Sequence, residues 1–338
     1  MWLWLAVAAC APTDGAPTAA PPPSYRSLAG EALGSTWSVK WRDNGAPDPE
    51  VRAAVVAALD EVDARMSTYR SDSDLALVRG ADEPVQVAQE TLEVVRAALS
   101  LAEATGGAFD PTVQPLVELW GITGERRTAA PSDEELARAM AQVGYEQVVA
   151  GVVDGVPTVG ARGAALDLSA IAKGHAVDRV AHNLSALGIT DHMVEVGGEV
   201  RVAGSGPSRL WRVGVDVPEE GLAPGESLAA VLAVTNMAVA TSGNYRNVYA
   251  LDGQRVWHTL DPRTGRPARS DAASATVVAP SCRTADGVAT ALMVLGSAGL
   301  PWVDTLPNVD AMVLVATPEG YEQRMTPAME PYLVRIQP

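Results

Sequence analysis

The stretch from Ala164 to Leu184, AALDLSAIAKGHAVDRVAHNL, limits the possible local structure strongly. An apolar, strand-like run ends at Asp167, the small residues 169–170 follow as a turn, and apolar side chains then recur at helical spacing. A helix that starts after a small turn can bind an anion, because its first N–H groups can approach a phosphate. Lys173, one of only two lysines in the chain, lies in the expected first turn. The alternative is an ordinary strand-to-helix connection with a solvated lysine.

The charge of the chain argues against nucleic-acid binding. The 338 residues carry a formal net charge of −16, and no basic stripe is present that could neutralise phosphates. An anionic ligand must therefore be held by a few local positive groups or by a metal ion. Cys10 and Cys282 are the only cysteines, which gives no basis for a disulfide framework or a thiolate zinc site.

The N-terminus indicates export and lipid anchoring. Residues 1–10, MWLWLAVAAC, resemble a bacterial lipobox, in which cleavage before Cys10 leaves this residue to carry lipid, although no Lys or Arg precedes the apolar run. Residues 11–25 are rich in Pro, Ala and Thr and are expected to tether the folded part, residues 26–338, to the membrane. We therefore expect a lipid-anchored protein of the bacterial cell envelope that faces the periplasm. The alternative is a cytoplasmic protein with an unusual N-terminus.

The remaining pattern predicts an α+β fold in one catalytic unit, with a mixed or antiparallel sheet and helices packed on it. Strands outnumber helices in the second half, which disfavours a doubly wound parallel sheet. The first strand is expected near residues 33–41. Helices are expected at about 49–66, at 89–104, after the polar cluster 71–74 and after a capping box at 132–135; a hairpin is expected at 154–155; further strands are expected at 193–202, 211–217, 228–239, 311–316 and 332–336.

Two loops contain unusual residues. Phe109, the only phenylalanine, lies in the segment 107–112, GAFDPT, where it could simply anchor a loop in the core. His258 opens HTLDPRTG and is one of four histidines. A histidine beside a rigid turn can accept a proton near neutral pH. In isolation, a hydrogen-bonding or solvated loop histidine explains the same pattern.

A third motif predicts a cation site. Thr284 is expected to cap a helix on which Asp286 and Thr290 lie four residues apart, on one face. A carboxylate and a hydroxyl one turn apart suit a hard cation such as Mg²⁺, which prefers oxygen ligands. Simple stabilisation of the helix dipole by Asp286 is the alternative.

Seven motifs in order resemble the ApbE family, the FAD:protein FMN transferases. They are MSTYRSDSDL, GGAFDPTVQPLVELWG, LDLSAIAKGHAVD, VEVGGEV, ATSGNYR, HTLDPRTG and ADGVATAL, and they span nearly all of the chain after the tether. The resemblance implies a T-fold-like domain that uses Mg²⁺, with Mn²⁺ as the alternative, to split FAD. It implies transfer of FMN to a Thr or Ser hydroxyl of a partner flavoprotein, with release of AMP.

The resemblance also implies roles for individual residues. Asp286, Thr290 and the backbone carbonyl of Ala170 would bind the metal, and His258 would take the proton from the acceptor hydroxyl. Ser169 and Ala170 stand where the family commonly has two glycines; both are small, so the carbonyl ligand should be retained. The FAD site would contain Leu33, Ser67, Thr68, Tyr69, Ala108, Phe109, Asp110, Asp167, Lys173, Gly197, Gly198 and Leu260.

Two other functions stay open at this point. Water could replace the acceptor hydroxyl, so that the protein hydrolyses FAD to FMN and AMP with the same metal and base. Alternatively, the protein could be a lipid-anchored FAD-binding protein without turnover, although such a protein has no need of a base beside a metal.

Overall fold

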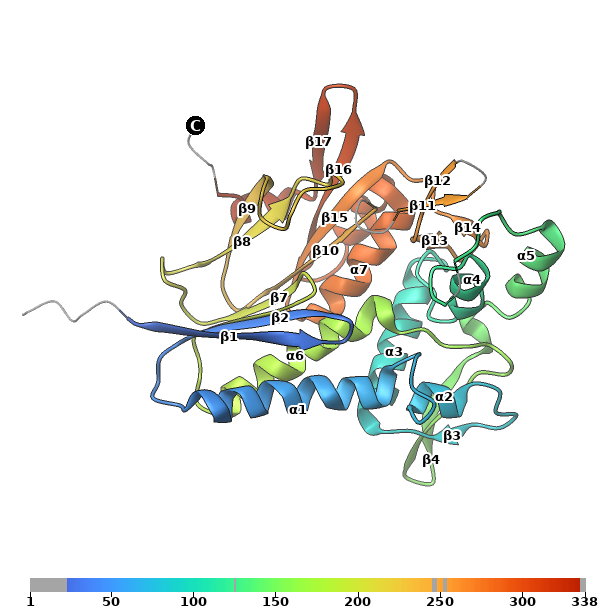
Figure 1. The fold of residues 1–338 in the computed structure, drawn as a ribbon, viewed down its shortest axis with the longest axis horizontal. Coiled ribbons are helices and arrows are strands. Elements are labelled where there is room, and N and C mark those ends of the chain that lie inside the picture. Colours follow the sequence, from blue (N-terminus) through green and yellow to red (C-terminus); the bar gives the residue numbers. More distant parts are fainter. Residues whose placement is uncertain (1–22, 125, 245–247, 252–253, 335–338) are drawn as a thin grey trace, which may run out of the picture.

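An eight-stranded sheet forms the centre of the molecule (Figure 1). The computed structural model describes residues 23–124, 126–244, 248–251 and 254–334. The strands follow the order β1 (Tyr25–Ala32), β2 (Ser35–Arg42), β6 (His192–Val196), β7 (Glu199–Ala203), β10 (Ala238–Gly243), β15 (Ala272–Ala279), β16 (Asp310–Thr317) and β17 (Gly320–Met325). Every neighbouring pair is antiparallel, which confirms the predicted fold class.

Both faces of this sheet are covered, and alternation along a strand explains how. On β16, Ala311, Val313 and Val315 join the main core, whereas Met312 and Leu314 join a second core on the opposite face. The main core lies under the helices α1 (Asp48–Met66), α3 (Gln89–Ala104), α6 (Ser169–Ala186) and α7 (Cys282–Leu295). The second lies under β8 (Trp211–Asp216), β9 (Leu228–Val234) and the 3₁₀ turn η3 (Pro327–Tyr332).

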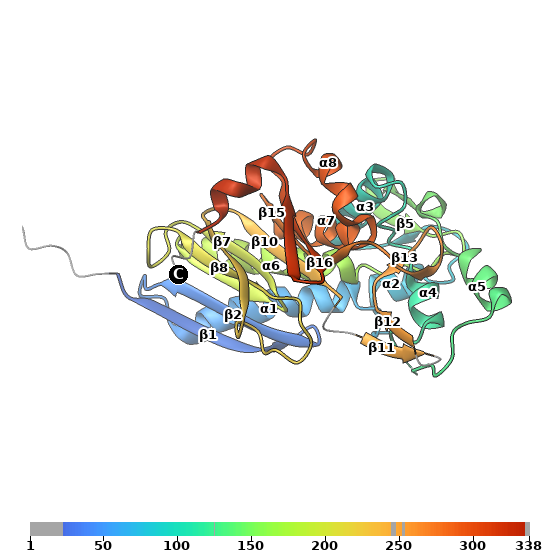
Figure 2. The same ribbon diagram turned by 90° about the horizontal axis from the view of Figure 1, so that it is seen from above.

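Smaller elements gather at one end of the molecule, where β11–β14 lie beside α4 and α5 (Figures 1 and 2). Their bounds are α2 (Asp74–Val78), β3 (Val85–Gln86), α4 (Gln114–Leu119), α5 (Asp133–Met140), η1 (Tyr145–Gln147), β4 (Val149–Val153), β5 (Val156–Gly160), β11 (Val248–Leu251), β12 (Gln254–Trp257), β13 (Leu260–Asp261) and β14 (Arg266–Pro267). Two short elements, η2 (Gly296–Gly299) and α8 (Leu300–Val303), follow α7. Leu116, Trp120, Leu136 and Leu260 share a separate small core that fixes α4 and α5 against the 258–267 segment.

Local signals placed several elements correctly. The helix predicted at 89–104 is α3 with the same bounds, and Ser73 caps α2 by accepting a hydrogen bond from the Ala76 N–H at 3.1 Å. The capping box is present, since Ser132 and Glu135 bond each other's backbone N–H groups. The hairpin at 154–155 joins β4 to β5.

Other predictions about the elements were wrong. The first strand is not the one near Leu33: β1 begins at Tyr25, one residue before the expected domain boundary, and pairs with β2 across a turn. Residues 164–168 form no strand, and the expected turn at 169–170 is the first part of α6. Ser281, not Thr284, caps α7, because its side chain accepts from the Thr284 N–H.

Two more strand predictions need correction. The segment 228–239 is two strands, β9 and β10, because Asn236 adopts a left-handed conformation with φ 52° and breaks the run. Within the expected strand 332–336, Tyr332 ends the turn η3 and Leu333 makes only an isolated bridge to Leu232, while residues 335–336 lie outside the described part. The expected lipobox with Cys10 lies outside the described residues, and so do residues 11–22 of the tether.

One helical stretch of the described chain, Cys282–Val303, is long and apolar enough to cross a membrane by length and composition. Its window is 61% buried inside the domain, as is usual for the core helix of a folded protein. This stretch contains α7, which packs against β10, β15 and α6.

The contact between α6 and α7 depends on a glycine. A Cβ atom added at Gly174 would overlap the Cys282 carbonyl oxygen and would lie 2.8 Å from the Asp286 Cβ atom. Backbone atoms cannot move aside as the end of a side chain can. Only glycine therefore allows the two helices to approach this closely.

We expect Gly174→Ala to lower the free energy of unfolding by about 1–3 kcal/mol, because the new methyl group forces the helices apart. Urea unfolding followed by circular dichroism measures this change. Gly151→Ala is the matched control, since a Cβ at Gly151 meets no atom within 4 Å. Equal losses in the two variants would contradict the prediction.

Candidate functional site

A buried charged cluster joins α6, α7 and the start of β7. The Lys173 Nζ atom lies 2.8 Å from Glu199 Oε1, and the Gly174 N–H donates to Asp286 Oδ2 at 2.9 Å. Glu199 and Asp286 are each only 3% exposed. Lys173 keeps 35% of its side chain exposed, so part of this residue reaches the surface beside the buried carboxylates.

The charges of this cluster do not balance. Burial, together with the negative charge of Asp286, raises the pKa of Glu199 to about 7, although Lys173 opposes the rise. Burial also raises the pKa of Asp286. For Lys173, burial alone would lower the pKa, but Glu199 and Asp286 outweigh it and the pKa is raised. Two carboxylates thus share one ammonium group, and a further positive charge would stabilise their ionised forms.

The oxygen atoms here fit a hard cation. Thr290 follows Asp286 by one turn of α7. The Gly174 N–H donates to Asp286 Oδ2, and Ala170 lies one turn before Gly174 on α6, so the fold brings the Ala170 turn of α6 close to this carboxylate. The described residues contain no group of three or more His, Cys, Asp or Glu arranged around a metal position. A cation here would therefore have one carboxylate together with hydroxyl, carbonyl and water oxygens, a set that Mg²⁺ accepts.

Two turns lie beside this cluster. Gly197 and Gly198, with φ of 62° and 106°, form the tight turn between β6 and β7, so the single strand expected at 193–202 is two strands. A Cβ at Gly197 would lie 3.0 Å from Ser35 Oγ and 3.4 Å from Glu199 Oε2. Leu33, in a left-handed conformation, turns the chain from β1 into β2 just before Ser35. The fold thus brings Leu33, the glycine pair and Glu199 into one region.

The Ala108–Phe109–Asp110 segment is fixed by hydrogen bonds of Asp110 and by the burial of Phe109. Asp110 Oδ1 accepts from the Thr112 N–H and Oγ1, and Oδ2 accepts from the Tyr145 N–H at 3.0 Å. Burial raises the pKa of Asp110. Phe109 is buried in the main core. In this structure both side chains shape the loop.

Asp167 links this loop to α6. Its N–H donates to the Pro111 carbonyl at 2.7 Å, and its carboxylate accepts from the N–H and the hydroxyl of Ser169. Burial raises the pKa of Asp167. The chain's own carboxylate thus takes one of the N–H groups at the helix start, where the sequence predicted a phosphate.

The 67–69 loop stands apart from the charged cluster. Ser67 Oγ accepts from the Tyr69 N–H at 3.2 Å, and the Ser67 carbonyl accepts from Ser73 Oγ. No hydrogen bond or ion pair of the described residues joins Ser67, Thr68 or Tyr69 to Lys173 or Asp286. Tyr69 is 81% exposed, which leaves its ring available to a ligand.

His258 follows β12 and begins a loop that packs near Ala108. The next residue, Thr259, donates from Oγ1 to Asn244 Oδ1 at 3.1 Å, and its carbonyl accepts from the Ala268 N–H. Ala268 in turn shares a small buried cluster with Ala108. Leu260 is 6% exposed and lies in the core that holds α4.

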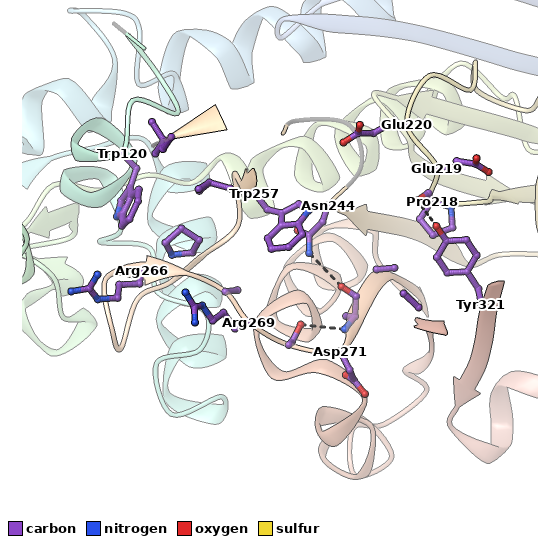
Figure 3. Close-up of a pocket in the computed structure, with 18 of the residues that line it drawn as sticks. Trp120, Pro218, Glu219, Glu220, Asn244, Trp257, Arg266, Arg269, Asp271 and Tyr321 are labelled. Carbon is purple, nitrogen blue, oxygen red and sulfur yellow. Dashed lines mark hydrogen bonds between the residues drawn. The ribbon is translucent and has the colours of Figure 1, made fainter. Parts of the chain in front are cut away.

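A cavity of about 1070 Å³ opens beside this loop (Figure 3). Trp120 lies toward one end of it, Pro218 and Tyr321 lie toward the other, and Trp257 lies between them. None of the site residues predicted from the sequence lines it. The cavity and the Lys173 cluster are therefore two separate features.

Comparisons of the sequence and of the structure with known proteins both find members of one family. A model of the ApbE family matches residues 33–313. An FAD:protein FMN transferase of Vibrio cholerae is 36% identical over 318 residues, 90% of this chain and 92% of that protein. The solved structure of the flavin transferase ApbE from Vibrio cholerae has a TM-score of 0.82 at 35% identity and covers 92% of this chain and 100% of that one.

A second structure extends the comparison. The apo form of the flavinyl transferase ApbE of Pseudomonas stutzeri has a TM-score of 0.80 at 32% identity and covers 93% of this chain and 98% of that one. The residues that the family model matches include both turns and both helices of the charged cluster. The chain belongs to the ApbE family, as the seven motifs predicted.

Glu199 is the residue of the cluster that the sequence prediction missed. It directly follows the glycine pair in VEVGGEV, and a charged residue at the end of a tight turn is usually solvated. Its Oε2 atom is buried and has no hydrogen-bond partner among the described residues. The sequence signal that could have identified Glu199 is its place in the motif VEVGGEV. Glu199 lies 26 residues after Lys173, the residue that it binds.

We expect Glu199 to contribute stability to the metal-free protein that is lost as the pH rises. The Glu199 carboxyl binds its proton more tightly in the folded state, so its contribution is complete below a pH of about 4.5 and is lost as the pH approaches about 7. Urea unfolding in chelator, across this range, should show a steeper fall for the unaltered protein than for Glu199→Gln. Glu31→Gln, which changes an exposed carboxyl on β1, is the control. Parallel curves for the unaltered protein and Glu199→Gln would contradict the prediction.

Proposed function

We propose that this protein transfers FMN from FAD to a Thr or Ser hydroxyl of a partner flavoprotein and releases AMP. The relatives named FAD:protein FMN transferase from Vibrio cholerae and Haemophilus influenzae each match 90% of the chain, which supports this activity. The observation that carries the proposal is the Lys173–Glu199–Asp286 cluster. It is a mostly buried charge arrangement, reached from the surface through Lys173, that suits a pyrophosphate with a bound cation.

In the proposed reaction, the acceptor oxygen forms a bond to the FMN phosphorus. The bond from that phosphorus to the bridging oxygen breaks, and this oxygen leaves with AMP. His258 takes the proton of the acceptor hydroxyl, which is a poor nucleophile until it is deprotonated. Lys173 offsets the negative charge that builds on the phosphate oxygens in an otherwise acidic protein.

We propose that Asp286, Thr290 and the Ala170 carbonyl hold Mg²⁺ or Mn²⁺. Such an ion, when bound, neutralises charge on the pyrophosphate. The raised pKa of Asp286 and the partnerless Oε2 of Glu199 both indicate a site that favours added positive charge. Gly174 holds the Asp286 carboxylate in place through its N–H.

The FAD site is proposed to lie along the start of α6. Its contributors are Asp167 and Lys173 near the helix start, the Ala108–Asp110 and Leu260 loops, and the Leu33 and Gly197–Gly198 turns. The Ser67–Tyr69 loop would close over the ligand, with the exposed ring of Tyr69 as the contact. The bond between Asp167 and Pro111 supports this arrangement, because it ties two of these segments together.

We further propose that Cys10 carries lipid and that residues 11–25 hold the domain at a membrane facing the periplasm. The support is the lipobox-like run MWLWLAVAAC and the Pro/Ala-rich segment after it. Metabolic labelling with a fatty-acid analogue tests the anchor, since Cys10→Ser would abolish the label.

Mass spectrometry tests the activity directly. The protein lacking the first 22 residues is mixed with FAD, Mg²⁺ and a flavoprotein domain that has an FMN-accepting threonine. We expect the partner to gain the mass of one FMN, and chelator to prevent this. Free FMN and AMP without a labelled partner would indicate FAD hydrolysis instead, and intact bound FAD would indicate a binding protein.

His258→Ala should lower the rate of FMN transfer about 100- to 10,000-fold, the usual contribution of a general base. Equilibrium binding of FAD, followed by flavin fluorescence, should change little, because the base acts on the acceptor hydroxyl. His182→Ala provides the comparison, since His182 is an exposed residue of α6. Unchanged turnover in His258→Ala would show that another group takes the proton.

Asp286→Asn should lower the transfer rate at least ~100-fold at a fixed Mg²⁺ concentration, because the cation loses its carboxylate ligand. Calorimetric titration with Mg²⁺ should show weaker binding by the same variant. Asp304→Asn, at an exposed carboxylate after α8, should match the unaltered protein in both measurements. Normal Mg²⁺ binding by Asp286→Asn would place the cation elsewhere.

A further inference from the structure

The large cavity beside the His258 loop has no part in the FAD and metal sites described above. Its walls come from β12, the 266–273 segment, the loop with Pro218 and Glu219, and the ends of β16 and β17 (Figure 3). The far wall is fixed in place, because Tyr321 Oη donates to the Pro218 carbonyl at 2.9 Å. A cavity with such walls is part of the folded domain.

We propose that this cavity receives the segment of the acceptor flavoprotein that presents the hydroxyl. The inference rests on the proposed function and adds to it the surface on which the protein substrate docks. The occupant is a stretch of polypeptide, and the alternative occupant, part of FAD itself, is an outcome of the test below.

The position of the cavity relative to the base is the first support. Trp257 lines the cavity and immediately precedes His258. Asn244 also lines it and accepts a hydrogen bond from Thr259, the residue after His258. The base is thus flanked on both sides in the sequence by contacts to the cavity. His258 itself does not line the cavity; the residues next to it in the sequence do or bond to a lining residue, so a segment bound there would lie beside the base.

The size of the cavity and the kinds of residue in it are the second support. About 1070 Å³ reaches the upper limit of pockets that enclose one small molecule. Its lining includes Trp120, Trp257, Tyr321, Arg266 and Arg269. Trp, Tyr and Arg are the residues that contribute most binding energy at protein interfaces. Such a lining suits a polypeptide with mixed apolar and polar groups.

Charge on the rim is the third support. Arg269 is exposed, and no carboxylate of the described residues pairs with it, whereas Arg266 is bonded to Asp133 at 2.8 Å. The Arg269 guanidinium group is therefore available among the residues that line the cavity. It can bind a carboxylate of the partner by two hydrogen bonds. Glu219, Glu220 and Asp271 also line the cavity, so it contains carboxylates as well as arginines, and this distribution of charge would set the direction of the bound segment.

Steady-state kinetics with the flavoprotein domain as the varied substrate tests the inference. Arg269→Glu and Trp257→Ala should each raise the KM for the domain at least tenfold. The KM for FAD and its dissociation constant should stay within twofold. Arg212→Glu is the matched control for the charge reversal, because Arg212 is exposed on β8 and does not line the cavity. It should leave both KM values unchanged.

The outcomes separate the inference from the proposed function. Weakened FAD binding in Arg269→Glu would show that the cavity holds part of FAD and would overturn the inference. An unchanged KM for the domain in Arg269→Glu would also overturn it, and this variant, at an exposed position, remains informative if Trp257→Ala does not fold. If the unaltered protein labels no acceptor, the proposed function fails, and the inference fails with it.

Discussion

The close packing of α6 on α7 is the contact on which the candidate site depends. Gly174 lets the Asp286 carboxylate reach a backbone N–H of the neighbouring helix, and this bond joins residues 112 positions apart. Lys173, one residue before, then points to Glu199 at the start of β7. Two helices and a hairpin of the central sheet thereby hold three charged groups at fixed positions. A site on such elements is more rigid than one built from loops alone.

The start of α6 extends this arrangement toward the other end of the molecule. Asp167 bonds the Pro111 carbonyl just before the helix begins, and the Ala108 loop packs against Ala268, which in turn bonds Thr259. One helix end thus connects the buried charges, the Phe109 loop and the segment that bears His258. The helix is fixed by the sheet on one side and by these loops on the other.

The sequence predicted those features that depend on neighbouring residues. The period of apolar residues gave α3, the Ser132–Glu135 spacing gave the capping box, and the motif order gave the family. Predictions failed where distant contacts decide the structure. Residues 164–168 are apolar like a strand but pair with no strand, because the buried loop at Pro111 takes the Asp167 N–H instead.

The dependence on distant contacts also explains which residues of the candidate site the sequence could not predict. Asp286 and Thr290 could be paired from their spacing on one helix, and Lys173 from its rarity. Glu199 could not be assigned, because only the register of β6 with β7 turns its side chain inward to the lysine. The cavity was also beyond the sequence, since its walls come from segments spread between Trp120 and Tyr321.

The apolar stretch Cys282–Val303 has a consequence for biosynthesis. If the chain is exported as proposed, this stretch passes through a membrane channel while it is still unfolded, and a long apolar segment can then be retained in the lipid. Asp286 and Arg283 place two charged groups near its start, and charge opposes insertion into lipid. The carboxylate proposed to bind a cation in the finished protein would thus also help the chain to complete its passage across the membrane.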